Sequence, residues 1–377
     1  MIAPPESNKR PARLAPLHDA LACVERIAQP VAPRTIELGM ACGHVLAADL
    51  SVGRLMPPVA LSLRDGWAVR ADDIADAGPY APQLLASPAW VEVGDPLPAN
   101  CDAVLPADAV TISGQMAEAH ASLAAGDGVL AAGSDAQPKG LLRRAGQCLR
   151  LSDVAILQTL GLSHVLVRQP RVKVCGVNPL IEAGIDTVGP LVAHFVEAGG
   201  GVPVLDPGAS DPARLAEALI DETVDAVIAI GGTGVGRRDR SIRILETVGR
   251  IEIHGIGLIP GETAAIGVAG SKPVLMLPGR LDAALAVWLV LGRKLMAALS
   301  GRIERDPTVP VTLRRKIVST VGMAEVIPLR RCEGGVEPVA SGFFPLGRLV
   351  GADGWVLITP ESEGQPAGST IDMQAFA

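Results

Sequence analysis

The sequence predicts a multidomain α/β protein with a central doubly wound α/β domain, β-rich N-terminal domains and a small C-terminal β-barrel. Residues 168–303 alternate strand-like and helix-like runs, which is typical of a parallel sheet covered by helices. Residues 59–137 and 304–377 carry short apolar runs between turn signals. The chain has 377 residues and is 49% hydrophobic but only 2% aromatic, so Ala, Val, Leu and Ile must build its cores.

The N-terminal region is predicted to begin with an amphipathic helix over residues 17–28, which Pro30 and Pro33 end. The run Met56-Pro57-Pro58 indicates a rigid hinge. A second helix follows the β-rich region, with Ser152 as its expected N-cap and Gly161 as its expected C-cap. We therefore expect four parts: residues 12–56 with 138–167 as an extended linking domain, 57–137, 168–303 and 304–377.

The central region is predicted element by element from its apolar runs. Strands are expected at residues 171–177, 201–205, 225–230 and 272–277, and helices at 187–199, 212–222, 240–248 and 281–300. Asp211 and Pro212 supply an N-cap and a first-turn proline for the helix expected at residues 212–222. The alternation predicts a parallel sheet with ligands at the carboxyl ends of its strands.

Composition excludes several classes of function. The formal charge of −7 and the pI near 5.5 disfavour a nucleic-acid or acidic-membrane surface, and the few aromatics disfavour base stacking. The six cysteines are far apart, and the N-terminus has no apolar signal core. The uninterrupted apolar stretch within residues 281–300 is too short to span a bilayer. We expect a soluble cytoplasmic protein with no nucleic-acid or membrane partner.

The most informative stretch is DAVIAIGGTGVGRRDRS, residues 225–241. A buried strand leads into a glycine-rich loop and then a helix, so backbone N–H groups and the helix N-terminus favour an anion. Phosphate or pterin binding is the functional interpretation. A tight turn with a solvated charge run is the alternative, and the glycine spacing is not that of dinucleotide-binding loops.

This stretch looks like the pterin-binding loop shared by the MogA and MoeA families. The matching positions are Gly231, Gly232, Thr233, Gly234, Gly236 and Asp239. Leu277-Pro278-Gly279 is similar to a turn that contributes to the same pocket in those families. Taken by itself, this segment is more simply explained as an ordinary turn at the end of a strand.

Further segments extend the resemblance to the MoeA/gephyrin E-domain family. PPVALSLRDGWAVRADD (residues 57–73), GDPLPANCDAVLPAD (94–108), LAAGSD (130–135), HGIGLIPGETAAIG (254–267) and ADGWVLITPESEG (352–364) follow the order of the family's motifs. Family membership implies binding of adenylylated molybdopterin and insertion of molybdenum from molybdate with release of AMP, with Mg²⁺ as an expected metal of unknown ligands.

The resemblance assigns roles to individual residues. The retained acids Asp65, Asp135, Asp186 and Asp239 are the expected catalytic group. The expected cofactor-binding group is Gly231, Gly232, Thr233, Gly234, Gly236, Arg237, Arg238, Pro278, Gly279 and Arg280. Two family lysines fall on Ile259 and Glu262, and a family aspartate falls on Ala60. Arginine holds tetrahedral oxyanions through paired donors, so Arg237, Arg238 or Arg280 could replace those lysines.

The substitutions leave more than one function open. The first is a molybdenumtransferase with a rebuilt anion site. The second is a non-catalytic carrier or adaptor that captures molybdopterin or the finished cofactor and hands it to a molybdoenzyme. A MogA-type protein is the other partner that the resemblance implies. The third is a scaffold with a vestigial pocket. The resemblance also implies an elongated homodimer, with residues 59–137 of one chain facing Gly231–Asp239 of the other.

Overall fold

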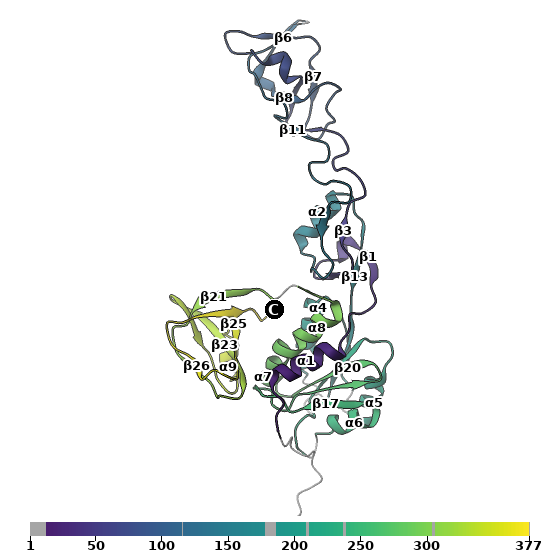
Figure 1. Ribbon diagram of the computed structural model, residues 1–377, viewed down its shortest axis with the longest axis vertical. Helices are drawn as coiled ribbons and strands as arrows, with labels where there is room; N and C mark the ends of the chain where they lie inside the picture. Colours follow the sequence, from purple (N-terminus) through teal and green to yellow (C-terminus); the bar gives the residue numbers. More distant parts are fainter. Residues whose placement is uncertain are drawn as a thin grey trace, which may run out of the picture. The chain divides into compact units, whose positions relative to one another are not determined.

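The computed structural model describes residues 13–114, 116–177, 186–208, 211–236, 239–303 and 306–376 (Figure 1). The chain forms two compact units. The first unit comprises Met1–Ala48, Ala145–Leu151 and His164–Ala377, and the second comprises Asp49–Arg144 and Ser152–Ser163. The four-part division expected from the sequence stays a prediction, although the N-terminal helix packs with the central sheet rather than with the second unit.

A six-stranded sheet forms the centre of the first unit, in the order β15-β14-β16-β20-β19-β17. The bounds are β14 Arg171–Gly176, β15 Val202–Asp206, β16 Ala226–Ile230, β17 Arg250–His254, β19 Ala265–Ala269 and β20 Lys272–Leu277. The first four strands in this order are parallel, as predicted. Strand β19 runs antiparallel to β20, and β17 runs antiparallel to β19, so these two strands, which the sequence analysis did not predict, make the sheet mixed. The reason is the turn Gly270-Ser271, which joins β19 to β20 and is too short for a parallel crossover.

Helices cover both faces of this sheet. One face carries α5 (Pro212–Ile220) and α6 (Ser241–Val248). The other carries α1 (Leu17–Ile27), α4 (Val188–Ala198) and the continuous helix formed by α7 (Leu281–Val287), η4 (Trp288–Gly292) and α8 (Arg293–Ser300). Every residue of β16 is buried, because alternate side chains enter the two cores. The result is a three-layer α/β domain.

The helix Leu281–Ser300 is long and apolar enough to cross a membrane by length and composition. In this fold 78% of that apolar window is buried inside the protein. Trp288 stacks on Phe195 of α4, with ring centroids 5.6 Å apart and planes 11° from parallel. The hydrophobicity of this helix therefore reflects its place in the core.

Two helix ends test the capping signals in the sequence. The carboxylate of Asp211 accepts a hydrogen bond from Ala213 N–H, and Pro212 opens α5, as predicted. Earlier in the chain, the prediction that Ser152 is the N-cap of α2 (Leu151–Thr159) is wrong, because this helix already begins at Leu151. Gly161 follows α2 with a φ of 82°, the left-handed conformation expected after a helix end.

The rest of the first unit is β-rich. A three-stranded sheet has the order β1-β13-β2, and a C-terminal sheet has the order β18-β23-β25-β27-β21, with β24 paired to β23 and a separate β22-β26 pair. The bounds are β1 Arg34–Glu37, β2 Val45–Leu46, β13 His164–Arg168, β18 Leu258–Ile259, β21 Thr308–Thr312, β22 Ile317–Val318, β23 Ala324–Cys332, β24 Gly335–Pro338, β25 Gly354–Ile358, β26 Gly364–Gln365 and β27 Thr370–Gln374. Helices η1 (Leu38–Met40) and α9 (Leu346–Leu349) are short.

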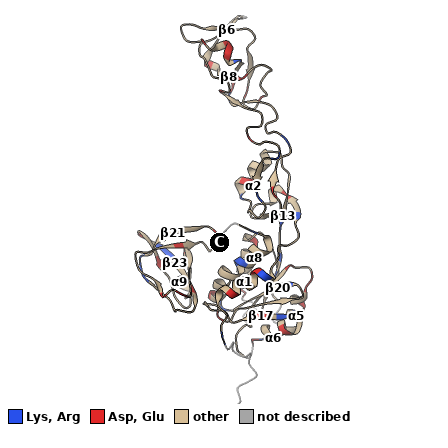
Figure 2. Ribbon diagram, in the orientation of Figure 1, with Lys and Arg blue, Asp and Glu red and all other residues tan. Residues whose placement is uncertain are grey.

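Together with nearly all of α2, the second unit contains small sheets, in agreement with the β-rich prediction. These are β7-β5-β8, β6-β10-β9, β11-β4 and β12-β3. The bounds are β3 Leu50–Ser51, β4 Leu61–Ser62, β5 Gly66–Val69, β6 Gln83–Leu85, β7 Ala89–Val91, β8 Ala103–Pro106, β9 Val110–Ser113, β10 Met116–Ala119, β11 Val129–Leu130 and β12 Leu141–Arg143, with η2 Ala71–Ile74 and η3 Ala107–Ala109. Charged residues of both signs are distributed over both units (Figure 2).

Candidate functional site

The candidate site lies at the carboxyl edge of the parallel strands. Gly176 of β14 pairs with Ile230 of β16, and Ile230 pairs with Leu277 of β20, so these three strands end side by side. The glycine loop follows β16, and Pro278 follows β20. Gly231 N–H donates to Leu277 O at 2.8 Å, which brings the two sequence motifs into direct contact. This is the edge at which open α/β sheets bind ligands.

The loop begins with two residues in the left-handed region. Gly231 has a φ of 101° and Gly232 a φ of 68°. A Cβ on Gly232 would lie 2.3 Å from the Oγ of Ser241. Both the dihedral angle and the space therefore require glycine at this position.

The carbonyl groups of the loop are turned towards the protein. Ser241 Oγ donates to Gly231 O at 2.8 Å, and Ser241 N–H donates to Gly232 O at 3.1 Å. The imidazole Nε2 of His254 lies 3.0 Å from Thr233 O. The oxygens of three consecutive loop carbonyls are therefore held inside the protein.

Thr233 also faces the protein interior, and its predicted role in cofactor binding stays a prediction. Its side chain is buried, and its hydroxyl lies 3.1 Å from the hydroxyl of Thr263. The sequence predicted Thr233 as a ligand-binding hydroxyl, but it did not identify Ser241, His254 or Thr263 as residues that hold the loop. Ser241 appeared only as the last residue of the glycine-rich stretch at 225–241, and His254 and Thr263 only within the family-like segment at 254–267.

Asp239 closes the loop. Its Oδ2 accepts a hydrogen bond of 2.7 Å from Gly236 N–H, and a Cβ on Gly234 would lie 2.7 Å from the same oxygen. This carboxylate therefore shapes the loop. Its predicted catalytic role stays a prediction. Arg237 and Arg238 lie outside the described residues.

Arg280 is held by a buried carboxylate. Its Nε and Nη2 donate to the two oxygens of Asp282 at 3.1 and 2.7 Å. The Asp282 side chain is only 4% exposed, whereas that of Arg280 is 69% exposed. Asp282 also accepts a hydrogen bond from Phe344 N–H at 3.1 Å. The pairing fixes the guanidinium orientation and offsets much of its positive charge.

The positions expected to hold lysines carry no positive charge. Ile259 is half-buried, and Glu262 is exposed, with its carboxylate accepting a hydrogen bond from Gly261 N–H at 3.0 Å. A carboxylate near an anion site reverses the local field. The missing positive charge at these two positions favours a site that binds a ligand over one that holds molybdate for catalysis.

The other predicted acids lie at the start of α4 or in the second unit. Asp186 Oδ1 accepts a hydrogen bond from Gly189 N–H at 2.9 Å in the first turn of α4. Asp65 and Asp135 belong to the second unit and are exposed. Asp65 accepts a hydrogen bond from Val93 N–H at 2.8 Å. Their predicted catalytic roles stay predictions.

A metal site is not evident in the part of the chain that the structure describes. Among those residues, no group of three or more His, Cys, Asp or Glu side chains is arranged to hold an ion. The expected Mg²⁺ therefore has no ligand set that can be named from these side chains.

Two family descriptions match this chain over separate segments. Residues 15–161 match the family described as the MoeA N-terminal region (domain I and II). Residues 178–298 match the family described as a probable molybdopterin binding domain, which contains the glycine loop.

Individual relatives resemble the chain over most of its length. A molybdopterin molybdenumtransferase from Haemophilus influenzae is 23% identical and covers 94% of this chain and 96% of its own. Molybdopterin molybdenumtransferase 1 from Mycobacterium tuberculosis is 26% identical and covers 73% of this chain and 76% of its own. A molybdopterin biosynthesis MoeA protein from Pyrococcus horikoshii shares the fold, with a TM-score of 0.77, 22% identity and coverage of 96% of this chain and 100% of its own.

Proposed function

Because the chain belongs to the MoeA family of molybdenum cofactor biosynthesis proteins, we propose that its glycine loop, residues 231–236, binds molybdopterin. One observation carries this proposal. The carbonyl oxygens of Gly231, Gly232 and Thr233 all accept hydrogen bonds from the domain itself. A loop with its oxygens taken up inside the protein suits an anionic ligand such as the phosphate of a pterin.

The reaction we propose is insertion of molybdenum from molybdate into adenylylated molybdopterin, with release of AMP. The names of the bacterial relatives support transfer of molybdenum. Leu277 contacts the glycine loop, and Arg280 follows it three residues later in the chain. Asp282 holds the guanidinium of Arg280 in a fixed orientation. A pre-oriented guanidinium can present the donors that are not used by Asp282 to a tetrahedral oxyanion.

A second candidate function is a carrier that binds the pterin without inserting metal. Glu262 places a carboxylate where the family resemblance leads us to expect a lysine, and Asp282 offsets the charge of Arg280. Both effects weaken the attraction for molybdate. The loop itself is unaffected, so pterin binding would remain.

The experiment that separates these functions measures two quantities on the full chain. Molybdopterin retention reports on the loop, and AMP release from adenylylated molybdopterin with Mg²⁺, with and without molybdate, reports on the transfer. Molybdate-dependent AMP release establishes the transferase. Retention of pterin without AMP release establishes the carrier. If the protein neither retains pterin nor releases AMP, the proposed function is refuted.

Three variants connect the outcome to the site. Gly232→Ala is expected to abolish pterin retention, because its Cβ would clash with Ser241 Oγ. Arg280→Ala is expected to reduce molybdate-dependent release while pterin is retained. Arg214→Ala is the control, since Arg214 is an exposed arginine of the same unit that pairs with Asp206.

We also propose a homodimer in the cytoplasm that serves a molybdoenzyme or a MogA-type partner. The family resemblance supports this arrangement, and the six free cysteines are consistent with a reducing compartment. Light scattering on purified protein tests the dimer. A species of 38.8 kDa, the mass of one chain, would refute it.

A further inference from the structure

Glu325 is a buried carboxylate of the C-terminal sheet that belongs neither to the glycine loop nor to the residues that hold it. It lies in β23 and is only 2% exposed. Its Oε1 accepts hydrogen bonds of 2.7 Å from both Ser341 Oγ and Gly342 N–H, and its Oε2 accepts one of 2.8 Å from Ser319 Oγ. Hydrogen bonds to a carboxylate are roughly twice as strong as those between neutral groups. Glu325 therefore fixes the segment that follows β24.

The segment that Glu325 holds leads to the charged pair at the start of α7. Two residues after Gly342, the N–H of the buried Phe344 donates to Asp282 Oδ2 at 3.1 Å. The same oxygen of Asp282 accepts a hydrogen bond of 2.7 Å from Arg280 Nη2. Residues two apart in a chain are separated by at most about 7 Å. A shift of the segment at Glu325 must therefore be felt at the N–H that reaches Asp282.

The backbone of Glu325 also lies beside a segment that supports the glycine loop. Strand β18 pairs with β23, with Ile259 opposite Glu325. Four residues after Ile259, the hydroxyl of Thr263 lies 3.1 Å from the hydroxyl of Thr233 in the glycine loop. Glu325 is thus next to one segment that contacts the loop, and its side chain holds another that leads to Arg280.

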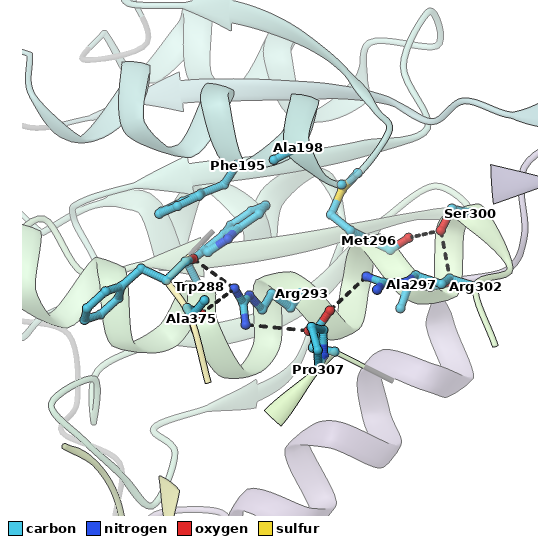
Figure 3. Close-up of a pocket in the computed structure, with 13 residues that line it drawn as sticks. Phe195, Ala198, Trp288, Arg293, Met296, Ala297, Ser300, Arg302, Pro307 and Ala375 are labelled. Atoms are coloured by element: carbon cyan, nitrogen blue, oxygen red, sulfur yellow. Dashed lines mark hydrogen bonds and ion pairs between the residues drawn. The ribbon is translucent and has the colours of Figure 1, made fainter. Parts of the chain in front are cut away.

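The C-terminal sheet does not depend on Glu325 alone for its attachment to the central domain. Arg293 of α8 donates to the carbonyl oxygens of Ala375 and Phe376, each at 2.9 Å (Figure 3). Trp355 Nε1 donates to Ala375 O at 3.1 Å, and the Trp355 ring belongs to the same hydrophobic core as the helices of the central domain. A change at Glu325 is therefore expected to move the segment that it holds without detaching the sheet.

We propose that Glu325 is a positioning residue for the oxyanion that Arg280 binds. It fixes the segment that begins at Ser341, this segment sets Phe344 N–H against Asp282, and Asp282 holds the guanidinium. A donor group that is oriented in advance lowers the ordering cost of binding. This role rests on the proposed function, since it requires that Arg280 meets molybdate. Glu325 itself touches neither the pterin nor the oxyanion.

The chain offers a matched pair of variants. Ser341→Ala and Ser319→Ala each remove one hydroxyl donor from the same carboxylate, but only Ser341 begins the segment that reaches Asp282. We expect Ser341→Ala to raise the molybdate concentration for half-maximal AMP release by about threefold. The maximal rate and pterin retention should change little, because Arg280 and the glycine loop remain. Ser319→Ala should respond to molybdate as the unaltered chain does.

Variants of Glu325 itself extend this test. Glu325→Met removes every acceptor, so we expect about a tenfold increase in the half-maximal molybdate concentration. Glu325→Gln keeps one acceptor oxygen for Ser341 and Gly342 and should restore most of the response. Circular dichroism melts confirm that each variant is folded, and the serine pair alone suffices if Glu325→Met is not.

A second measurement follows the connection without using activity. Hydrogen exchange of the Phe344 amide in the full chain reports on its bond to Asp282. Ser341→Ala and Glu325→Met should exchange this amide faster, Glu325→Gln should recover most of the protection, and Ser319→Ala should leave it unchanged.

The two measurements separate the failure of this role from the failure of the proposed function. Equal molybdate responses in Ser341→Ala and Ser319→Ala, in a chain that releases AMP, would overturn the positioning role and leave the transferase intact. Faster exchange of Phe344 without a changed molybdate response would reduce Glu325 to a structural contact. An unaltered chain that releases no AMP with molybdate would refute the transferase, and the positioning role would fall with it.

Discussion

At the scale of single residues, the glycine loop depends on side chains that come from other elements. Ser241 begins α6 and His254 ends β17, yet both donate hydrogen bonds to consecutive carbonyls of the loop. Neither residue has a spacing that would identify it as a ligand-binding group. Their effect is to fix the loop before the ligand arrives, which lowers the ordering cost of binding.

His254 can be tested as a positioning residue. His254→Leu removes the donor to Thr233 O, so we expect molybdopterin binding to weaken by about five- to tenfold, the value of one lost hydrogen bond. His254→Gln supplies a side-chain N–H and should restore most of the affinity. His194→Leu, at an exposed position of α4, is the control. Equal affinity in His254→Leu and the unaltered chain would contradict this role.

Cys175 gives a prediction about alkaline stability. Burial, with a smaller effect of the Asp206 carboxylate, raises the pKa of the Cys175 thiol to about 12. The unfolded chain ionises this thiol near its ordinary pKa of about 8.5, whereas the folded chain keeps its proton. Its contribution to stability is therefore complete below about pH 8.5 and is lost as pH rises towards 12.

The measurement is chemical unfolding across that range of pH. Cys175→Ala is expected to be less stable at pH 7, because it leaves a cavity, but its stability should fall less steeply between about pH 9 and 11. Cys332→Ala, at an exposed thiol, should follow the unaltered chain. Parallel curves for Cys175→Ala and the unaltered chain would show that this thiol does not contribute.

At the scale of elements, helix α5 depends on its cap. Asp211→Ala removes the acceptor for Ala213 N–H and should destabilise α5 by about 1 kcal/mol. Asp211→Asn keeps an acceptor oxygen and should lose only a few tenths of that. Hydrogen exchange of the α5 amides is the suitable measurement, since it reports on the opening of this helix itself. Unchanged exchange in Asp211→Ala would contradict the capping role.

At the scale of the whole molecule, Asp282 joins two parts of the first unit. It accepts hydrogen bonds from Arg280, three residues after the Leu277 that contacts the glycine loop, and from Phe344 N–H, in the segment that precedes α9. Close to that segment, the buried Glu325 accepts hydrogen bonds from Ser341 Oγ and Gly342 N–H. The C-terminal sheet is therefore connected to the candidate anion site through two carboxylates.

Asp282→Ala tests this connection. It leaves Phe344 N–H without its acceptor in a buried setting, so we expect a loss of about 1–3 kcal/mol in unfolding free energy and a reduced response to molybdate. Asp282→Asn keeps one acceptor oxygen and should retain more stability than activity, because Arg280 loses its ionic partner. Asp19→Ala, at an exposed carboxylate of α1, serves as the control. Full stability in Asp282→Ala would exclude the connection.

Much of this protein follows from local patterns in its sequence. The glycine loop, the turn after Leu277, the cap at Asp211 and the helices and four parallel strands of the central domain depend on neighbouring residues, so periodicity and turn chemistry suffice to predict them. The family resemblance added the identity of the expected ligand.

Other features depend on residues that are distant along the chain. The antiparallel β19 and β17, the support of Thr233 by His254 and the pairing of Arg280 and Phe344 with Asp282 arise only when separate elements pack together. Local propensity carries no information about which distant partner a carbonyl or carboxylate will meet. Those contacts are set by tertiary packing, because each polar group buried there must find its partner within the folded chain.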